Sequence, residues 1–146
     1  NHITTPTQDG PLRAMKAAYN MAKKNNGGEL HVDYVNAHGT STPVNDKNET
    51  AALKELFSGN QDCPPVTSTK GQVGHCLGAA GSIEAIIAIK AMQEGIIPPT
   101  INQVESDENC DLDYCANEAR QMKIDHAISN SFGFGGTNGS ILLSKV

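Results

Sequence analysis

The sequence predicts a layered α/β domain built on a mixed β-sheet whose last strands are antiparallel. Three observations predict this fold class. Helix-like and strand-like patterns alternate along the chain in the order α, β, α, β, α. Two strand-like runs then follow with only a glycine-rich stretch between them, which is typical of a hairpin. The chain has 146 residues, which is long enough for one domain with a sizeable core.

The first helix is expected over residues 11–25, because Pro11 is a favoured first helical residue. Gly27 and Gly28 end it. Apolar residues then alternate over residues 30–36, and this period of two predicts the first strand.

The second helix is expected from Pro43, directly after the capping residue Thr42, to Gly59. A short strand follows at Val66, and a turn then leads into a helix over residues 83–94. That helix is apolar nearly all round, which predicts that it is buried.

The last two strands are expected over residues 125–131 and 141–143, on either side of a glycine-rich run at residues 132–139. This run differs from a dinucleotide-binding loop, because Asn138 stands at the last glycine position and a strand follows in place of a helix. We therefore expect a tight hairpin whose backbone N–H groups point at a ligand.

Composition excludes two classes of partner. The net charge of −5 argues against nucleic acid, and no apolar run approaches the roughly 18 residues of a membrane span. The four cysteines lack Cys-x-x-Cys spacing, so we interpret them as reduced thiols of an intracellular protein. Because the chain begins on Asn1 without an initiator methionine, we also expect a fragment of a longer protein.

Two histidines and a lysine are the candidate site residues. His38 and His75 each follow a predicted strand, at the sheet edge where α/β proteins bind ligands. Lys70 precedes His75 in the turn, and Glu84 lies in the apolar helix, where a carboxylate needs a partner. We expect Lys70 to be that partner and the histidines to share one site. Two unrelated loop histidines and a purely structural ion pair remain the alternatives.

Two further groups receive weaker interpretations. Cys76 adjoins His75 but lacks the surroundings of a nucleophile, so we expect a packing thiol. An acidic loop has the ligand spacing of a calcium-binding loop, although Leu112 occupies the position that needs glycine. A solvated loop is therefore favoured over a calcium module, whose ligands would be Asp107, Asn109, Asp111, Asp113 and Glu118.

Three ordered runs resemble the C-terminal half of a β-ketoacyl-acyl-carrier-protein synthase, an elongating condensing enzyme of the thiolase-like family. They are residues 35–43 (VNAHGTSTP), residues 69–81 (TKGQVGHCLGAAG) and residues 130–139 (NSFGFGGTNG). The resemblance implies a thiolase-like half of α-β-α layers with a mixed five-stranded sheet and antiparallel last strands. It assigns residues 1–146 to the C-terminal domain, without the N-terminal half that carries the nucleophilic cysteine. Such a half is expected to expose apolar surface.

The resemblance also implies roles for individual residues. His38 and His75 would bind the malonyl thioester carbonyl and stabilise the enolate, Lys70 would support His75, and Phe134 would contribute a backbone N–H and a gate. The supporting residues would be Glu84, Asp46, Glu49 and Phe132, with Asp46 and Glu49 in the network around Lys70. Thr40 and Thr42 would hydrogen-bond the pantetheine arm. Departures from the family pattern fall at Gly71, Gln72, Val73, Val44 and Asn45.

The implied activity is decarboxylative condensation of malonyl-acyl carrier protein with an acyl-enzyme in fatty-acid elongation, without cofactor or metal. The implied partners are acyl carrier protein, the N-terminal half and a second subunit of a homodimer. The compartment would be the cytoplasm in a bacterium, and the plastid or mitochondrion in a eukaryote. A polyketide ketosynthase and a non-catalytic chain-length-factor-like partner are the alternatives. The presence of His38, His75 and Lys70 argues against the second.

Overall fold

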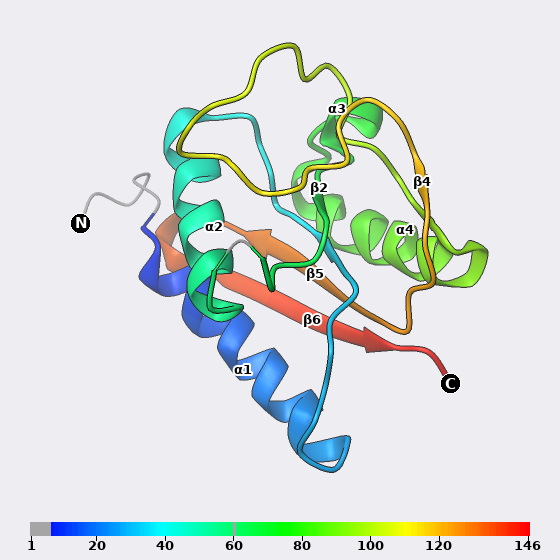
Figure 1. The fold of residues 1–146 in the computed structure, drawn as a ribbon. Coiled ribbons are helices and arrows are strands. Elements are labelled where there is room, and N and C mark those ends of the chain that lie inside the picture. The colour runs from blue at the N-terminus through cyan, green and yellow to red at the C-terminus, as the bar shows by residue number, and fades with distance from the viewer. Residues whose placement is uncertain (1–6, 60) are drawn as a thin grey trace.

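A computed structural model describes residues 7–59 and 61–146 of the chain. At the centre of these residues is a four-stranded mixed sheet. The strand order is β2 (Val66–Thr67), β1 (Tyr34–Asn36), β5 (His126–Phe132), β6 (Asn138–Ser144), and strands β5 and β6 are prominent in Figure 1. Strand β1 pairs in parallel with both β2 and β5, and β5 pairs antiparallel with β6. The fold class and the antiparallel last strands are therefore confirmed.

The expected count of five strands is wrong for the described part of the sheet, which has four. Two more strands, β3 (Ile96–Ile97) and β4 (Arg120–Gln121), form a separate antiparallel ribbon. Pro98 and Pro99 follow β3 directly and have no backbone N–H to donate, so this strand cannot extend.

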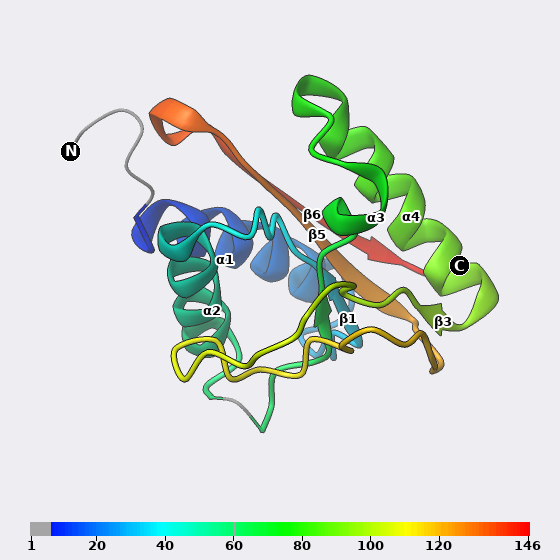
Figure 2. The same cartoon turned by 90° about the horizontal axis from the view of Figure 1, so that it is seen from above.

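Helices cover both faces of the sheet and give the expected α-β-α layers (Figure 2). Helices α1 (Asp9–Asn25) and α2 (Pro43–Leu56) lie on one face, and α4 (Ala80–Glu94) lies on the other. Successive strand residues alternate between these layers. Val35 packs into the core beneath α1 and α2, whereas Tyr34 packs into the core beneath α4.

The first helix and strand differ from the expectation at their ends. Helix α1 begins at Asp9, two residues before Pro11. Strand β1 is limited to Tyr34–Asn36, shorter than the expected residues 30–36. The reason is its neighbour: β5 begins at His126, so the residues before Asp33 have no strand to pair with.

Helix α4 is only half buried, which corrects the expectation that it is enclosed. Glu84 and Ala88 face the sheet and are 1% and 0% exposed. On the opposite side, Ile86 and Ile89 are 61% and 41% exposed. The outer face is apolar and has no covering layer among the described residues.

Two tight segments deliver residues to one edge of the sheet. The short helix α3 (Lys70–Val73) and the 3₁₀ turn η1 (Leu77–Ala79) connect β2 to α4. The β5–β6 hairpin closes through the 3₁₀ turn η2 (Phe134–Gly136), where Gly135 and Gly136 have φ of 75° and 82° that favour glycine. No helix in the described ranges is long and apolar enough to cross a membrane.

Candidate active site

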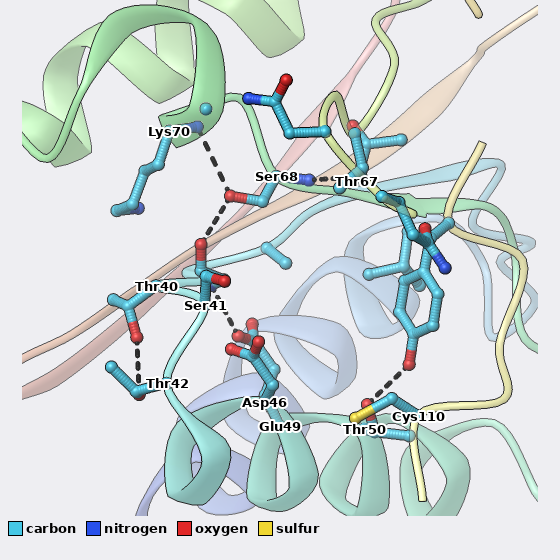
Figure 3. A pocket seen from close by; sticks show the side chains of 18 of the residues that line it. Thr40, Ser41, Thr42, Asp46, Glu49, Thr50, Thr67, Ser68, Lys70 and Cys110 are labelled. Atoms are coloured by element: carbon cyan, nitrogen blue, oxygen red, sulfur yellow. Dashed lines mark hydrogen bonds between the residues drawn. The ribbon is translucent and has the colours of Figure 1, made fainter. Parts of the chain in front are cut away.

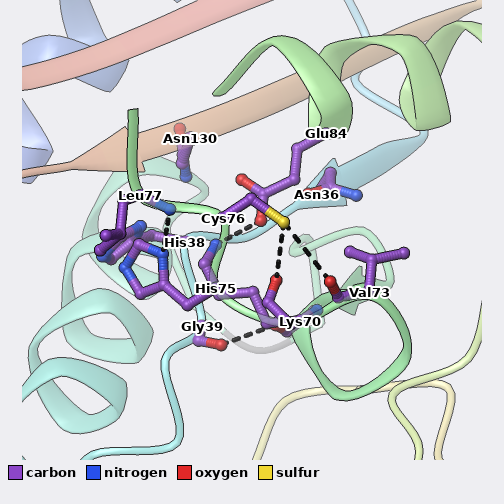
Figure 4. A network of polar contacts seen from close by, with 12 residues as sticks. Asn36, His38, Gly39, Lys70, Val73, His75, Cys76, Leu77, Glu84 and Asn130 are labelled. Carbon is purple, nitrogen blue, oxygen red and sulfur yellow. Dashed lines mark hydrogen bonds and ion pairs between the residues drawn. The ribbon is translucent and has the colours of Figure 1, made fainter. Parts of the chain in front are cut away.

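The histidines His38 and His75 meet at the carboxyl ends of two neighbouring parallel strands. β1 ends at Asn36 and leads to His38, while β2 ends at Thr67 and leads through α3 to His75. Their ring centroids are 5.5 Å apart, with the rings at 85° to one another (Figure 4). Two segments that are distant in sequence thus present imidazoles to the same space, because parallel strands end at the same edge.

Lys70 and Glu84 form a buried ion pair beside the histidines (Figure 4). The side chains are 6% and 2% exposed, and Glu84 reaches the pair from α4. Burial raises the pKa of the Glu84 carboxyl, while the Lys70 ammonium opposes that rise. The second oxygen, Oε2 of Glu84, has no hydrogen-bond partner within the described ranges.

His38 is held neutral by its surroundings. Burial, followed by the positive charge of Lys70, lowers the pKa of His38 to about 4. The side chain is enclosed, and the Phe132 ring lies 5.7 Å from its ring. A neutral imidazole at pH 7 can donate one N–H to an oxygen that gains negative charge.

His75 is exposed and has a defined tautomer. The Leu77 backbone N–H donates to its Nδ1 at 3.2 Å. Because an accepting nitrogen carries no proton, the neutral ring has its proton on Nε2. The 3₁₀ turn after His75 therefore leaves Nε2 of this ring as a donor.

Glu49 supports the loop that carries His38. Its two carboxylate oxygens each accept one backbone N–H, from His38 and from Gly39, both at 2.9 Å. Asn130 donates to the same carboxylate at 3.3 Å. Burial raises the pKa of Glu49, and these hydrogen bonds oppose the rise. Two of the three donors are backbone N–H groups of the His38 loop, so the Glu49 carboxylate holds that loop in place.

The network expected around Lys70 therefore has different members. In the described structure, Glu84 is the acidic partner of Lys70, and Glu49 instead contacts the His38 loop. Asp46 lies one turn before Glu49 on α2, where its backbone N–H donates to the Thr42 carbonyl at 3.0 Å. Asp46 lines the adjacent cavity.

A cavity of about 760 Å³ opens beside this pair of loops (Figure 3). Lys70 and His75 lie on its wall, together with Thr40 and Thr42, whose hydroxyl oxygens are 2.9 Å apart. A volume of this size is typical of small-molecule sites. The two threonine hydroxyls thus line the same cavity as Lys70 and His75.

The two aromatic candidates are placed differently. Phe132 packs against His38, as its ring distance shows. Phe134 lies in η2 and is 77% exposed, and no ring contact joins it to either histidine in the described structure. The structure brings Phe132 to the histidine pair and leaves Phe134 outside it.

Two further residues of the site, one buried and one half-buried, were missed from the sequence. Asn130, on β5, is fully enclosed and accepts a hydrogen bond from the Ser140 hydroxyl at 2.9 Å. Ser68 follows β2 and contacts both loops. The available signal was the run of polar residues, including Asn130, inside a strand that otherwise reads as core.

The acidic loop has no converging calcium ligands. Asp107 accepts hydrogen bonds from Asn109, and Asp111 pairs with Lys54. Asp113 binds the Arg120 guanidinium. Over residues 7–59 and 61–146, no three histidine, cysteine or acidic side chains are grouped to hold a metal. The calcium interpretation is therefore not supported.

Comparisons with known proteins give a consistent family. Residues 1–104 match the family model described as the beta-ketoacyl synthase, C-terminal domain. A 3-oxoacyl-[acyl-carrier-protein] synthase 2 from Coxiella burnetii is 55% identical over 115 residues, which is 79% of this chain and 28% of the relative. Nodulation protein E from Rhizobium meliloti is 44% identical over 99% of this chain and 35% of the relative. The chain spans about a third of the length of the curated relatives it matches.

Solved structures agree with that result. A beta-ketoacyl synthase from Burkholderia phymatum has a TM-score of 0.88 and 40% identity, covering 99% of this chain and 34% of that chain. This likeness confirms the thiolase-like ketosynthase fold.

Proposed function

The chain belongs to the β-ketoacyl synthase family, and from this premise we propose that it is the C-terminal half of an elongating β-ketoacyl-acyl-carrier-protein synthase. The full protein would condense malonyl-acyl carrier protein with an acyl-enzyme thioester in fatty-acid synthesis. The observation that carries the proposal is the meeting of two imidazoles, 5.5 Å apart, beside a buried lysine–glutamate pair.

In the proposed reaction, His38 and His75 each donate an N–H to the malonyl thioester oxygen. The bond to the carboxylate breaks, carbon dioxide leaves, and its electron pair forms an enolate on that oxygen. The enolate carbon then attacks the acyl thioester, and the enzyme thiolate leaves. The lowered pKa of His38 suits that ring to donate as a neutral group, and the Leu77 N–H bound at Nδ1 leaves Nε2 of His75 as its donor.

Lys70 is proposed to favour this protonation state. Its positive charge opposes protonation of His38, and Glu84 keeps the ammonium in place. Thr40 and Thr42 would hydrogen-bond the pantetheine arm in the cavity. Phe134 would contribute its backbone N–H and a mobile ring, while Phe132 would shape the space beside His38. Asp46 would line the entrance to the cavity.

The acyl-accepting cysteine is proposed to lie on the N-terminal half. Burial raises the pKa of the Cys63 thiol to about 12 and also raises the pKa of Cys110 and Cys115. A thiol of raised pKa is a poor nucleophile. Cys76 instead donates to the Val73 carbonyl at 3.4 Å. These properties support a malonyl-side role for this half.

Partners follow from the same proposal. The exposed apolar face of α4 suits the N-terminal half, and the assembled subunit would form a homodimer. Acyl carrier protein would deliver both substrates. One solved structure with 35% identity and a TM-score of 0.86 is described as a type II polyketide synthase acyl-carrier protein in complex with its ketosynthase. In a bacterium the reaction would take place in the cytoplasm, and in a eukaryote in the plastid or mitochondrion.

The proposal is tested by carbon dioxide release from malonyl-acyl carrier protein. In the full-length protein, His38→Ala and His75→Ala should each lower the decarboxylation rate about 10²–10³-fold, because each removes one donor to the developing oxyanion. The 146-residue chain alone should form no acyl thioester detectable by mass spectrometry. Unchanged decarboxylation in both variants would contradict the assignment.

A polyketide ketosynthase is the second candidate, because two solved relatives at 35% identity are described with type II polyketide or chain-length-factor partners. The two activities differ in the acceptor. A fatty-acid enzyme should extend saturated acyl chains, whereas a polyketide enzyme should extend unreduced β-keto chains. Competition between the two acceptors in one assay separates them.

A further inference from the structure

Ser68 joins the two loops that carry the histidines. Its hydroxyl donates to the Gly39 carbonyl oxygen at 2.6 Å, and the Lys70 backbone N–H approaches the same hydroxyl oxygen at 3.4 Å. Its own backbone N–H donates to the Thr100 hydroxyl oxygen at 3.1 Å. Figure 3 shows Ser68 between the loop with Thr40 and the start of α3. One short side chain therefore connects the His38 loop to the segment that leads to His75.

The two segments approach each other so closely at Gly39 and Ser68 that a larger residue than glycine does not fit at position 39. A Cβ atom at Gly39 would lie 2.5 Å from Ser68 Cβ, and Gly39 has φ of +40°. Glycine is therefore required at this point of the His38 loop. Its peptide is held on both sides, because Glu49 accepts its N–H and Ser68 donates to its carbonyl. The Ser68 hydroxyl thus contacts the Gly39 peptide at a point where the two loops approach closely.

We propose that Ser68 is a positioning residue, whose hydroxyl fixes the spacing of the His38 and His75 imidazoles on which malonyl decarboxylation depends. This inference rests on the proposed function. Ser68 acts through Gly39, which directly follows His38, and through Lys70, which precedes His75 by five residues. The reaction is sensitive to such spacing, because a misplacement of about 1 Å can cost about 10²-fold in rate.

The test is Ser68→Ala in the full-length protein, a change that removes a single oxygen atom. Decarboxylation of malonyl-acyl carrier protein should fall about tenfold, as expected for one lost hydrogen bond that orders the donors. Transfer of an acyl group to the enzyme cysteine uses the other half and should stay within about twofold. The matched control is Thr69→Val, since the Thr69 hydroxyl is buried and has no partner among the described residues.

A second readout uses the 146-residue chain. Ser68→Ala should shift the imidazole NMR signals of His38 and His75. The signals of His31, which precedes β1, and of His126, the first residue of β5, should stay unchanged. Thr69→Val should leave all four in place. Equal losses in both half-reactions, a decarboxylation rate equal to the unsubstituted protein, or unmoved His38 and His75 signals would each overturn the inference. Absence of decarboxylation in the unsubstituted protein would instead refute the proposed function.

Discussion

Removing either partner of the Lys70–Glu84 pair should destabilise the chain with opposite pH dependence. Glu84→Gln leaves a lysine whose side chain is 6% exposed without its carboxylate. A buried ammonium can neutralise itself, and from a pKa of about 10.4 this costs about 4.6 kcal/mol at pH 7, at 1.36 kcal/mol per unit. This cost is the upper limit of the loss in folding stability, because the lysine can release its proton whenever burying the unpaired charge would cost more.

Lys70→Met leaves the Glu84 carboxylate, whose side chain is 2% exposed, in the same position. Taking up a proton from a pKa of about 4.3 costs about 3.7 kcal/mol at pH 7. Both limits are large fractions of the roughly 5–15 kcal/mol by which domains are stable. We therefore expect each single variant to be strongly destabilised at pH 7.

The signs of the pH dependence differ. In Glu84→Gln the folded pKa of Lys70 lies below its unfolded value, so stability is regained as pH rises toward about 10.4. In Lys70→Met the folded pKa of Glu84 lies above its unfolded value, so stability is regained as pH falls toward about 4.3. Each slope reaches about 1.36 kcal/mol per pH unit relative to the unsubstituted chain.

Urea unfolding of the 146-residue chain between about pH 5.5 and 9 measures these slopes. The double variant Lys70→Met with Glu84→Gln is the control, since it has no unpaired charge and should show neither slope. Single variants as stable as the unsubstituted chain at pH 7, or two slopes of the same sign, would show that the pair is not buried as described.

Three further predictions concern His38, the Gly39 turn and the outer face of α4. The His38 imidazole should titrate near pH 4 by NMR, and a midpoint at 6.5 would contradict its burial. Because the folded pKa lies below the unfolded value, the free energy of unfolding should decrease as pH falls from about 6.5 toward 4. Gly39→Ala should lower the free energy of unfolding in urea by about 1–3 kcal/mol, because the added Cβ meets Ser68. Gly78→Ala, whose added Cβ has nothing within 4 Å, should lower it less, and equal losses would contradict the steric argument. The chain should self-associate in sedimentation experiments, and Ile86→Gln should weaken this with less than about 0.5 kcal/mol lost in stability; unchanged sedimentation would point to another surface.

The outer face of α4 illustrates a limit of periodicity. The sequence of this helix is apolar nearly all round, which predicted burial. In the chain, Ile86 and Ile89 are exposed because the sheet contacts only the face with Glu84 and Ala88. Periodicity indicates that a surface is suited to burial, but it does not say which molecule or domain covers it.

The sequence by itself determined the order of the elements, the hairpin at the end and the meeting of Lys70 with Glu84. These follow from local signals: helix starts, glycine turns and the need of a buried carboxylate for a partner within the same stretch. Only the tertiary structure decided that Glu49 holds the His38 loop, that Asn130 contacts Glu49 across 81 residues, and that Ser68 reaches Gly39. The physical reason is that these contacts depend on β1 lying between β2 and β5, and no local pattern encodes the order of strands in a sheet.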